Sequence, residues 1–397
     1  MLLITAAVWI LFIIVGIPII YVLALSILAL FARQGPIRNT PQALQFAILV
    51  PAHNEQSNIT ETLTSLAEIR YPKDSYEIVV IADNCSDGTA GVARQLGATV
   101  LERNDGTLRG KGYALRWGFG QLLDSKKRYA AFVVIDADSV VSTNILWAFS
   151  SSIEQGARAI QCADLLRPQP GLWNIEVVRL GFFLHNYVRP LGRSTFRGHV
   201  GAMGNGMCFT REVLERVPWN AFSQGEDLEY GLNLLLEGIP VEFSPAATVL
   251  ASMPVNPRHA ESQRSRWEMS RFPLIKKYAL PLLRSAWIQK SIRPIDALIE
   301  LLTPAWVNLV GIAVVSAIAG FVGAALELVP VLYGTIWSGL ALLGVLHMLI
   351  GLILARDPSL WMTVMAIPRY AFWKLLLYLK LVNRGHTTEW IRTPRDS

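Results

Sequence analysis

The stretch AAFVVIDADS, residues 130–139, decides the fold. In it an uninterrupted apolar run rich in Val and Ile ends in two aspartates, Asp136 and Asp138. A continuous rather than alternating apolar strand is typical of a parallel sheet that is covered on both faces. Carboxylates at positions i and i+2 of an extended segment lie on the same side of the chain. Together they favour a hard divalent cation, Mg²⁺ or Mn²⁺, so we predict a buried strand that leads to a metal site.

The same pattern recurs on both sides of this stretch. Short apolar runs end in polar and Gly residues, and helical stretches separate them. The runs are FAILVPAHNE (46–55), YEIVVIADNCSDGT (76–89), ATVLERND (98–105) and ARAIQCAD (157–164). Strands that alternate with helices predict an open α/β fold with a mostly parallel sheet. In such folds ligands bind beyond the carboxyl ends of the strands.

Residues with candidate chemistry collect at these strand ends. Asp83 ends the second run, and Glu226 and Asp227 lie together in QGEDLEYG (224–231). Single Asp, Asn or Gly residues after strands also form turns and caps, so the combination carries more weight than any member. Lys111 lies in a Gly-flanked loop that opens a helix, where its ammonium can meet phosphate. The sequence has neither the GxxxxGK[ST] nor the GxGxxG pattern, which disfavours ATPase and dinucleotide-binding functions.

The composition places this domain beside a membrane. Of 397 residues, 52% are hydrophobic and 17% charged, against about 25% charged in an ordinary soluble domain. Residues 1–32 contain no charged side chain, and residues 297–355 contain no Lys or Arg. Basic residues flank both blocks, which predicts that these flanks face the cytoplasm. The net charge of +6 therefore favours anionic lipid headgroups over nucleic acid.

These features divide the chain into six parts. We predict a transmembrane helix (1–32), a linker (33–44), the α/β catalytic domain (45–258), interfacial helices (259–295), a transmembrane hairpin (296–355), and an interfacial helix with a cytoplasmic tail (356–397). Within the hairpin, residues 297–325 and 329–354 each exceed the roughly 20 residues that cross a bilayer. Residues 359–382 are interrupted by charges and Pro368, which favours a helix in the interface.

Four motifs occur in order: Asp83 in ADNCSDGT, DAD at 136–138, GED at 225–227 and QRSRW at 263–267. This set resembles the membrane-integrated family 2 glycosyltransferases, the class of cellulose, chitin-oligosaccharide, hyaluronan and poly-N-acetylglucosamine synthases and of bacterial exopolysaccharide transferases. The resemblance implies a GT-A domain on the cytoplasmic face of the inner membrane, in a multi-pass protein. It also implies a UDP-sugar donor and a metal-dependent, inverting transfer.

The resemblance implies roles for individual residues. The residues expected to bind the donor are Ala52, Glu55, Asp83, Lys111, Asp136, Gln263, Arg264 and Arg266. Asp138, with Asp136 near it, is expected to hold Mg²⁺ or Mn²⁺ on the diphosphate. Asp227 is expected to be the general base, with Glu226 beside it in the catalytic pair. The residues expected to bind the acceptor are Trp267, Gly204 and Asn205.

The acceptor stays open at this stage. A growing exopolysaccharide, extended through a β linkage, is the leading hypothesis. A lipid acceptor, polyprenyl-linked or ceramide-like, is the alternative, and a non-catalytic sensor or channel subunit is a third. Three spanning helices are few for a private translocation pore. A polymer product would therefore call for an export partner, a homo-oligomer or help from the interfacial helices.

Overall fold

The computed structural model describes residues 2–33, 37, 43–253, 263 and 269–382. Contacts divide the chain into two compact units. The sheet unit contains the described parts of 33–167 and 197–298, and the helical unit contains those of 1–32, 168–196 and 299–388. Each unit is described by itself below.

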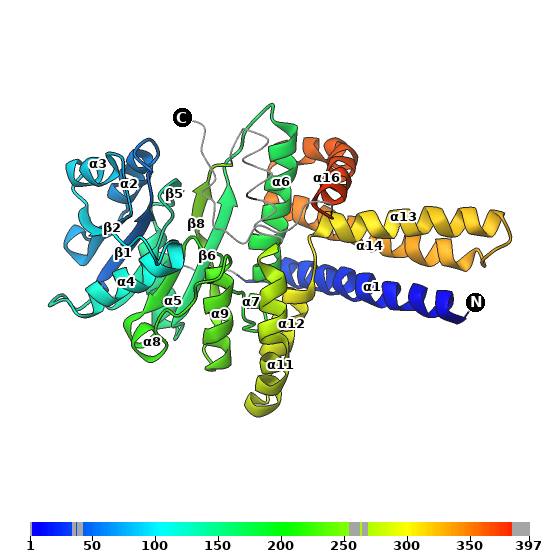
Figure 1. The fold of residues 1–397 in the computed structure, drawn as a ribbon, viewed down its shortest axis with the longest axis horizontal. Helices are drawn as coiled ribbons and strands as arrows, with labels where there is room; N and C mark the ends of the chain where they lie inside the picture. The colour runs from blue at the N-terminus through cyan, green and yellow to red at the C-terminus, as the bar shows by residue number, and fades with distance from the viewer. Residues whose placement is uncertain (1, 34–36, 38–42, 254–262, 264–268, 383–397) are drawn as a thin grey trace. The chain divides into compact units, whose positions relative to one another are not determined.

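The sheet unit is built on eight strands (Figure 1). They are β1 (Phe46–Ala52), β2 (Tyr76–Asp83), β3 (Thr99–Arg103), β4 (Ala131–Val134), β5 (Ser139–Val141), β6 (Ala159–Leu166), β7 (Met207–Thr210) and β8 (Val241–Ala251). Their order is β3-β2-β1-β4-β7-β6-β8-β5. Strands β1 to β4 pair in parallel, as do β6 and β8. The predicted α/β fold and the five predicted strands are confirmed.

The sequence did not predict the other three strands. Strand β7 runs antiparallel between β4 and β6, and β5 runs antiparallel to β8 at the edge. Strands β5 and β7 contain only three and four residues. Runs as short as β5 and β7 give no periodicity that would distinguish them from a loop. Strand β8 has eleven residues, so its length does not explain why it was not predicted.

Helices cover both faces of the sheet. The helices of this unit are α2 (Ile59–Ala67), η1 (Lys73–Ser75), α3 (Thr89–Gln95), α4 (Lys111–Leu123), α5 (Ile145–Glu154), α8 (Arg211–Arg216), α9 (Glu226–Leu236) and α11 (Arg271–Gln289). Alternate residues of β1 enter two different cores: Ile48 packs with Leu63 of α2, and Leu49 packs with Phe119 of α4. Burial on both faces explains why the strand is apolar at every position.

The helical unit contains the three apolar segments. Its elements are α1 (Leu2–Leu30), α6 (Trp173–Phe183), the π-helical turn η2 (Leu184–Val188), α7 (Arg189–Ser194), α13 (Trp306–Ala325), α14 (Leu332–Ala355), α15 (Pro358–Met362), η3 (Thr363–Ala366) and α16 (Ile367–Val382). Among the described residues, three helical segments are long and apolar enough to cross a membrane: Trp9–Leu30, Trp306–Ala325 and Leu332–Ala355. The first lies within the predicted helix 1–32, and the other two lie within the predicted hairpin.

The hairpin begins later than predicted. Residues 297–302 belong to a separate helix, α12 (Arg293–Leu302), and the first helix of the hairpin begins at Trp306. Pro304 separates the two helices, because proline donates no backbone N–H and disfavours a helical conformation in the residue before it. The prediction from composition was therefore wrong at this boundary.

The segment between β6 and β7 is the second difference. The prediction includes residues 168–196 in the catalytic domain, but in the structure they group with the helical unit. A Cβ on Gly192 would lie 2.1 Å from the carbonyl oxygen of Leu25 in α1, so α7 and α1 approach too closely for any larger residue. The buried Arg193 also donates to Glu300 Oε2 over 2.5 Å. Sequence patterns do not report such contacts.

Candidate active site

Three segments meet at the carboxyl ends of the central strands. Asp136 and Asp138 lie in the loop between β4 and β5, and Lys111 is the first residue of α4. Lys111 Nζ lies 2.5 Å from Asp136 Oδ1 and donates to the carbonyl oxygen of Gly204 over 2.6 Å. The structure therefore brings together a predicted metal ligand, a predicted phosphate-binding lysine and a predicted acceptor residue.

The acidic pair Glu226 and Asp227 lies in the first turn of α9, where the helix dipole stabilises carboxylates. A Cβ on Gly204 would lie 2.9 Å from Asp227 Oδ2 and 3.6 Å from Lys111 Nζ. Gly204 also has a φ of +85°, a conformation that favours glycine. The carboxylate of Asp227 thus lies beside the lysine and the aspartate loop, at a position that needs Gly204.

The pKa values of Lys111, Glu226 and Asp227 are shifted because these charged side chains are buried close to one another. Burial alone would lower the pKa of Lys111, but the carboxylates of Asp136, Glu226 and Asp227 raise it overall. Burial and the neighbouring Asp227 raise the pKa of Glu226 to about 7. Burial also raises the pKa of Asp227, against the opposing effect of Lys111. A carboxylate with a raised pKa is a stronger proton acceptor, as a general base must be.

The side chain of Asn205 forms hydrogen bonds that hold the loop with Asp136 and Asp138 in place. Its side chain accepts from the backbone N–H of Asp136 over 3.1 Å, and it donates to Ser139 Oγ over 2.9 Å and to Asp164 Oδ1 over 3.3 Å. Asn205 is only 3% exposed. Its predicted acceptor contact stays a prediction, while the geometry favours a supporting role that the sequence did not indicate.

The predicted donor residues lie at the ends of β1 and β2. Ala52 ends β1 and Asp83 ends β2, and Glu55 follows in a loop where its N–H donates to Thr89 Oγ1 over 2.8 Å. His53 connects the two strand ends, because its Nδ1 lies 2.7 Å from the carbonyl oxygen of Asp83. Ala52, Glu55 and Asp83 therefore lie within one region, and their donor-binding roles stay predictions.

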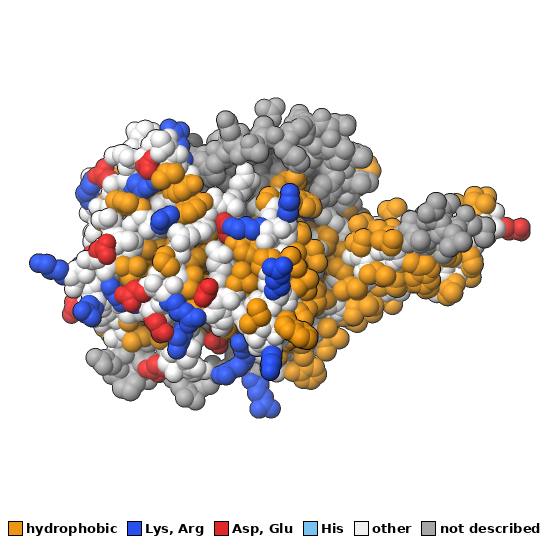
Figure 2. Space-filling view, turned by 60° about the horizontal axis from the view of Figure 1, so that its bottom comes forward, with side chains coloured by type: hydrophobic (Ala, Val, Ile, Leu, Met, Phe, Trp, Pro, Cys, Tyr) orange, Lys and Arg blue, Asp and Glu red, His pale blue; other side chains and the backbone are white. Residues whose placement is uncertain are grey.

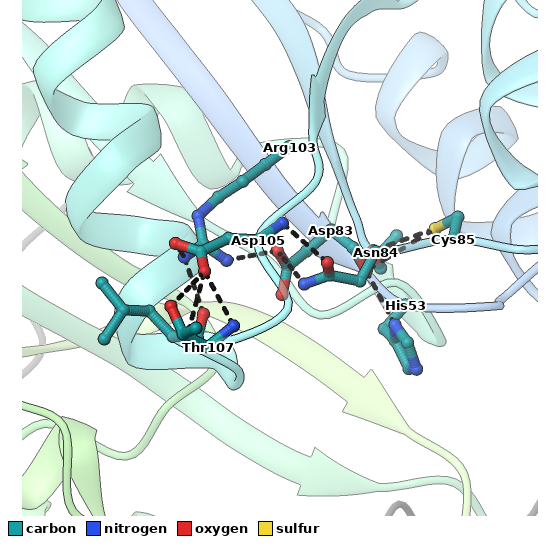
Figure 3. Close-up of polar contacts among 9 residues, drawn as sticks. His53, Asp83, Asn84, Cys85, Arg103, Asp105 and Thr107 are labelled. Atoms are coloured by element: carbon teal, nitrogen blue, oxygen red, sulfur yellow. Dashed lines mark hydrogen bonds and ion pairs between the residues drawn. The ribbon is translucent and has the colours of Figure 1, made fainter.

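A buried arginine that the sequence analysis missed holds Asp83 in place (Figure 3). Arg103, the last residue of β3, is 6% exposed and donates to Asp83 Oδ1 over 2.6 Å. Its other terminal nitrogen contacts Asp105 Oδ2 at 3.0 Å and the carbonyl oxygen of Leu108 at 2.6 Å. The backbone N–H of Leu108 and the Thr107 hydroxyl lower the pKa of Asp105 to about 2. Arg103 thus fixes both Asp83 and the following loop.

Replacing Arg103 by Ala is expected to destabilise the sheet unit and to weaken donor binding. Removing one partner of a buried ion pair typically costs about 3–5 kcal/mol, because the other charge stays buried without compensation. Arg94→Ala is the matched control: it removes an exposed ion pair with Glu102, for which the expected cost is at most about 1 kcal/mol. Thermal unfolding measures the first effect, and titration with a nucleoside diphosphate measures the second. Equal behaviour of the two variants would contradict the buried-pair account.

Glu229 orders the loop that leads into the acidic pair. It is 5% exposed, and its Oε2 accepts from the backbone N–H groups of Phe222 and Ser223 over 3.1 and 3.0 Å. Its Oε1 lies 2.6 Å from Lys277 Nζ of α11. Although burial opposes it, these partners hold the pKa of Glu229 below its usual value. The carboxylate therefore joins α11, the loop and the start of α9.

Glu229→Ala is expected to reduce stability. The N–H groups of Phe222 and Ser223, which are only partly buried, lose their acceptor, at a cost of at most about 1–3 kcal/mol each. Because the pKa of Glu229 is lower in the folded state than in the unfolded state, the stability that its carboxylate contributes is present above the usual pKa and is lost as the pH falls through the lowered value. The stability of the variant should therefore fall less steeply with decreasing pH than that of the wild-type protein. Unfolding midpoints measured against pH test this, with the exposed Glu237→Ala as a control that should leave the profile unchanged.

The carboxylates of Asp136 and Asp138 fit a divalent cation whose remaining ligands come from water and substrate. Among the described residues there is no group of three or more His, Cys, Asp or Glu side chains that could hold a metal ion. Asp136 and Asp138 supply two carboxylates, and both are partly exposed. Mg²⁺ is commonly held by one or two carboxylates, while water and substrate phosphates complete its shell. The site therefore fits a cation that binds together with a diphosphate.

The last motif falls mostly outside the described residues. Arg264, Arg266 and Trp267 are not described, so their predicted roles stay predictions. Gln263 is described, and within the described part of the chain its Oε1 is buried with no hydrogen-bond partner. A buried acceptor of this kind is expected to gain a donor when ligand is bound.

The known proteins whose sequences or folds are similar to this chain are described as glycosyltransferases or as synthases of glycosylated products. Residues 41–270 match the family model described as "Glycosyltransferase like family 2". The chain is 24% identical over 256 residues to the probable glycosyltransferase YdaM of Bacillus subtilis, across 60% of this chain and 58% of that protein. It is 26% identical over 215 residues to the beta-monoglucosyldiacylglycerol synthase of Trichormus variabilis, across 50% and 43%. It is 23% identical over 246 residues to the poly-beta-1,6-N-acetyl-D-glucosamine synthase of Staphylococcus aureus, across 59% and 56%.

One solved structure is similar over most of the chain. The mannosyltransferase PcManGT of Pyrobaculum calidifontis, in complex with GDP-Man and Mn²⁺, matches with a TM-score of 0.54 and 18% identity. The match covers 88% of this chain and 95% of that one. This likeness concerns the fold, which is the predicted GT-A type. The chain spans about half the length of the curated relatives given above.

Proposed function

This chain belongs to glycosyltransferase family 2, and from that membership we propose that it moves a sugar from a UDP-sugar to a growing exopolysaccharide or oligosaccharide, with inversion and a β linkage. The observation that carries the proposal is the cluster of Lys111, Asp136 and Asp227. Lys111 Nζ lies 2.5 Å from Asp136 Oδ1, and Asp227 lies beside the same lysine. Such a cluster offers positive charge for a phosphate and a carboxylate for an acceptor hydroxyl.

The donor would lie across the carboxyl ends of β1, β2 and β4. Ala52, Glu55 and Asp83 would hold the uracil and ribose, with Asp83 oriented by Arg103. Lys111 would then exchange its contact with Asp136 for one with the diphosphate, together with Gln263, Arg264 and Arg266. A Mg²⁺ or Mn²⁺ ion held by Asp138 and Asp136 would supply further positive charge to the diphosphate.

Transfer would be a single displacement. The acceptor hydroxyl oxygen forms a bond to the anomeric carbon from the face opposite UDP, while the bond from that carbon to the phosphate oxygen breaks. UDP leaves with the electron pair, and Asp227 takes the hydroxyl proton. The raised pKa of Asp227 suits it to this role, and Lys111 stabilises the charge that develops on UDP.

The acceptor would lie beside Gly204, where Trp267 would provide a stacking face. A lipid acceptor is the second candidate, and a relative whose name describes a glucosyldiacylglycerol synthase favours it.

We place the protein in the inner membrane as a multi-pass enzyme with the catalytic domain in the cytoplasm. The three candidate spans and the basic flanks support this placement. A polymer product would call for an export partner or a homo-oligomer.

Release of the nucleoside diphosphate, UDP or GDP, from a panel of donors tests the proposal. The panel contains UDP-glucose, UDP-galactose, UDP-N-acetylglucosamine, UDP-glucuronate and, for comparison, GDP-mannose, each with Mg²⁺ or Mn²⁺. We expect cation-dependent release with one UDP-sugar and a product that grows in size. A product with a single sugar on a lipid would favour the second candidate. No release with any UDP-sugar would overturn the proposal.

A further inference from the structure

The loop that leads into β7 contacts three of the residues proposed to take part in transfer. The carbonyl oxygen of Gly204 accepts a hydrogen bond from Lys111 Nζ over 2.6 Å, and the side chain of Asn205 accepts one from the backbone N–H of Asp136 over 3.1 Å. A Cβ on Gly204 would lie 2.9 Å from Asp227 Oδ2. A shift of this loop would therefore disturb the lysine, the aspartate loop and the proposed base together.

This loop, residues 203–206, is built on two glycines with positive φ. The φ angles of Gly204 and Gly206 are +85° and +70°. Ordering glycine costs more conformational entropy than ordering any other residue. A Cβ on Gly206 would lie 2.2 Å from Cys162 Sγ, so the loop lies tightly against β6. Partners on β6 are therefore well placed to fix the path of the loop.

Gln161 of β6 supplies such a partner. It pairs with Met207, the first residue of β7, and so lies next to the loop. Its Oε1 accepts from the backbone N–H of Met203 over 2.9 Å, and its Nε2 donates to the carbonyl oxygens of Asn205 over 2.7 Å and Cys162 over 3.0 Å. The carboxamide uses its acceptor and both of its N–H donors. One side chain thus connects two parts of the loop to β6.

The burial of Gln161 calls for an explanation. Figure 2 shows one face of the molecule, with charged side chains dispersed over its surface. Glutamine is also mostly exposed in proteins, yet Gln161 is 0% exposed in a strand between Ile160 and Cys162. Because its Oε1 faces an N–H group and its Nε2 faces carbonyl oxygens, an apolar residue in its place would leave those groups without partners.

We propose that Gln161 is a positioning residue for sugar transfer, which holds this loop so that the Gly204 carbonyl orients Lys111 beside Asp227. The inference rests on the proposed function and deepens it. The predicted contacts with uracil and ribose lie instead at the ends of β1 and β2. Loss of the carboxamide should therefore lower kcat, because the lysine and the base are misplaced, while the KM for the donor changes little.

Gln161→Met tests the role of the carboxamide, because methionine is similar in size but has neither the N–H donors nor the carbonyl acceptor. The full-length protein is assayed with the nucleotide sugar that the donor panel identifies. We expect kcat to fall about 10²-fold, the effect of a misplacement of roughly 1 Å, with the KM for the donor nearly unchanged. Hydrogen exchange at residues 203–206 should become faster, and this second measurement does not depend on transfer.

Tyr129→Phe is the matched control for a general loss of stability. Tyr129 is 5% exposed, and its hydroxyl donates to Glu77. It lies just before β4, at the opposite end of that strand from Asp136. The variant loses a hydrogen bond at a buried side chain, but kcat and the hydrogen exchange of residues 203–206 should stay as in the wild-type protein.

Gln161→Glu keeps the inference testable if Gln161→Met does not fold. A protonated carboxyl group offers one O–H donor and one carbonyl acceptor, whereas a carboxylate offers no donor. Burial raises the pKa of a carboxyl group, so the protonated form is restored as the pH falls. The kcat of this variant, relative to the wild-type value at the same pH, should therefore rise with decreasing pH.

The measurements separate this inference from the proposed function. A wild-type kcat in Gln161→Met, unchanged hydrogen exchange at residues 203–206, or a relative kcat of Gln161→Glu that does not change with pH would each overturn the positioning role. Faster exchange in Gln161→Met, combined with no transfer by the wild-type protein, would confirm that Gln161 holds the loop and would overturn the proposed function.

Discussion

Asp227→Asn is expected to reduce sugar transfer by about 10²–10⁴-fold, the usual contribution of a general base. The amide cannot accept the acceptor proton, although its size and its place in the first turn of α9 are retained. Asp227 lies beside Gly204 and Lys111 rather than at the strand ends that hold Asp83. UDP affinity is therefore expected to change little. UDP release measures the first effect and calorimetric titration of UDP the second.

Glu226→Gln is the matched comparison for this prediction. The two carboxylates are adjacent, and the pKa of each is raised by burial, so loss of charge alone affects both variants in the same direction. We expect the smaller loss of turnover in Glu226→Gln. If Glu226→Gln instead lost turnover and Asp227→Asn retained it, Glu226 rather than Asp227 would be the base.

Asp138→Asn and removal of divalent cations are expected to have the second large effect. The described residues offer two carboxylates at this site, so the loss of one leaves few protein ligands for the ion. We expect transfer to stop in the presence of a chelator and to return with Mn²⁺ or Mg²⁺. The variant should need at least about tenfold more Mn²⁺ for half-maximal binding in the presence of UDP. Electron paramagnetic resonance of free Mn²⁺ measures this directly.

Asp124→Asn is the control for the cation experiment, because Asp124 is an exposed carboxylate at the other end of α4. It should bind Mn²⁺ as the wild-type protein does. Full transfer in the presence of the chelator would contradict a cation-dependent reaction. Unchanged Mn²⁺ binding by Asp138→Asn would contradict the assignment of Asp138 as a metal ligand. It would not contradict the cation dependence of the reaction.

The strands and the position of the aspartates could be predicted because burial on both faces leaves a local signal. The apolar run in residues 130–139 can be recognised from those residues alone, and Asp136 follows it directly. The antiparallel strand β7 left no such signal. Its four residues become a strand only because β4 and β6 lie on either side of them.

The supporting residues of the site could not be predicted, because their role depends on contacts between distant segments. Arg103 is followed by an Asn and an Asp, which resembles an exposed polar turn, yet it is buried against Asp83. Glu229 has the spacing of an ordinary helix residue until its contacts with the loop before α9 are known. The signal that could have been used for Arg103 was its place at the end of an apolar strand beside Asp83.

The anomeric configuration of the product shows whether Asp227 activates an acceptor hydroxyl for one displacement at the anomeric carbon. With an α-linked UDP-sugar such as UDP-glucose or UDP-N-acetylglucosamine as donor, proton NMR of the newly transferred residue should show the large coupling of an axial anomeric proton, which is the β configuration. An α-linked product from the wild-type enzyme would require a different mechanism and would contradict the account.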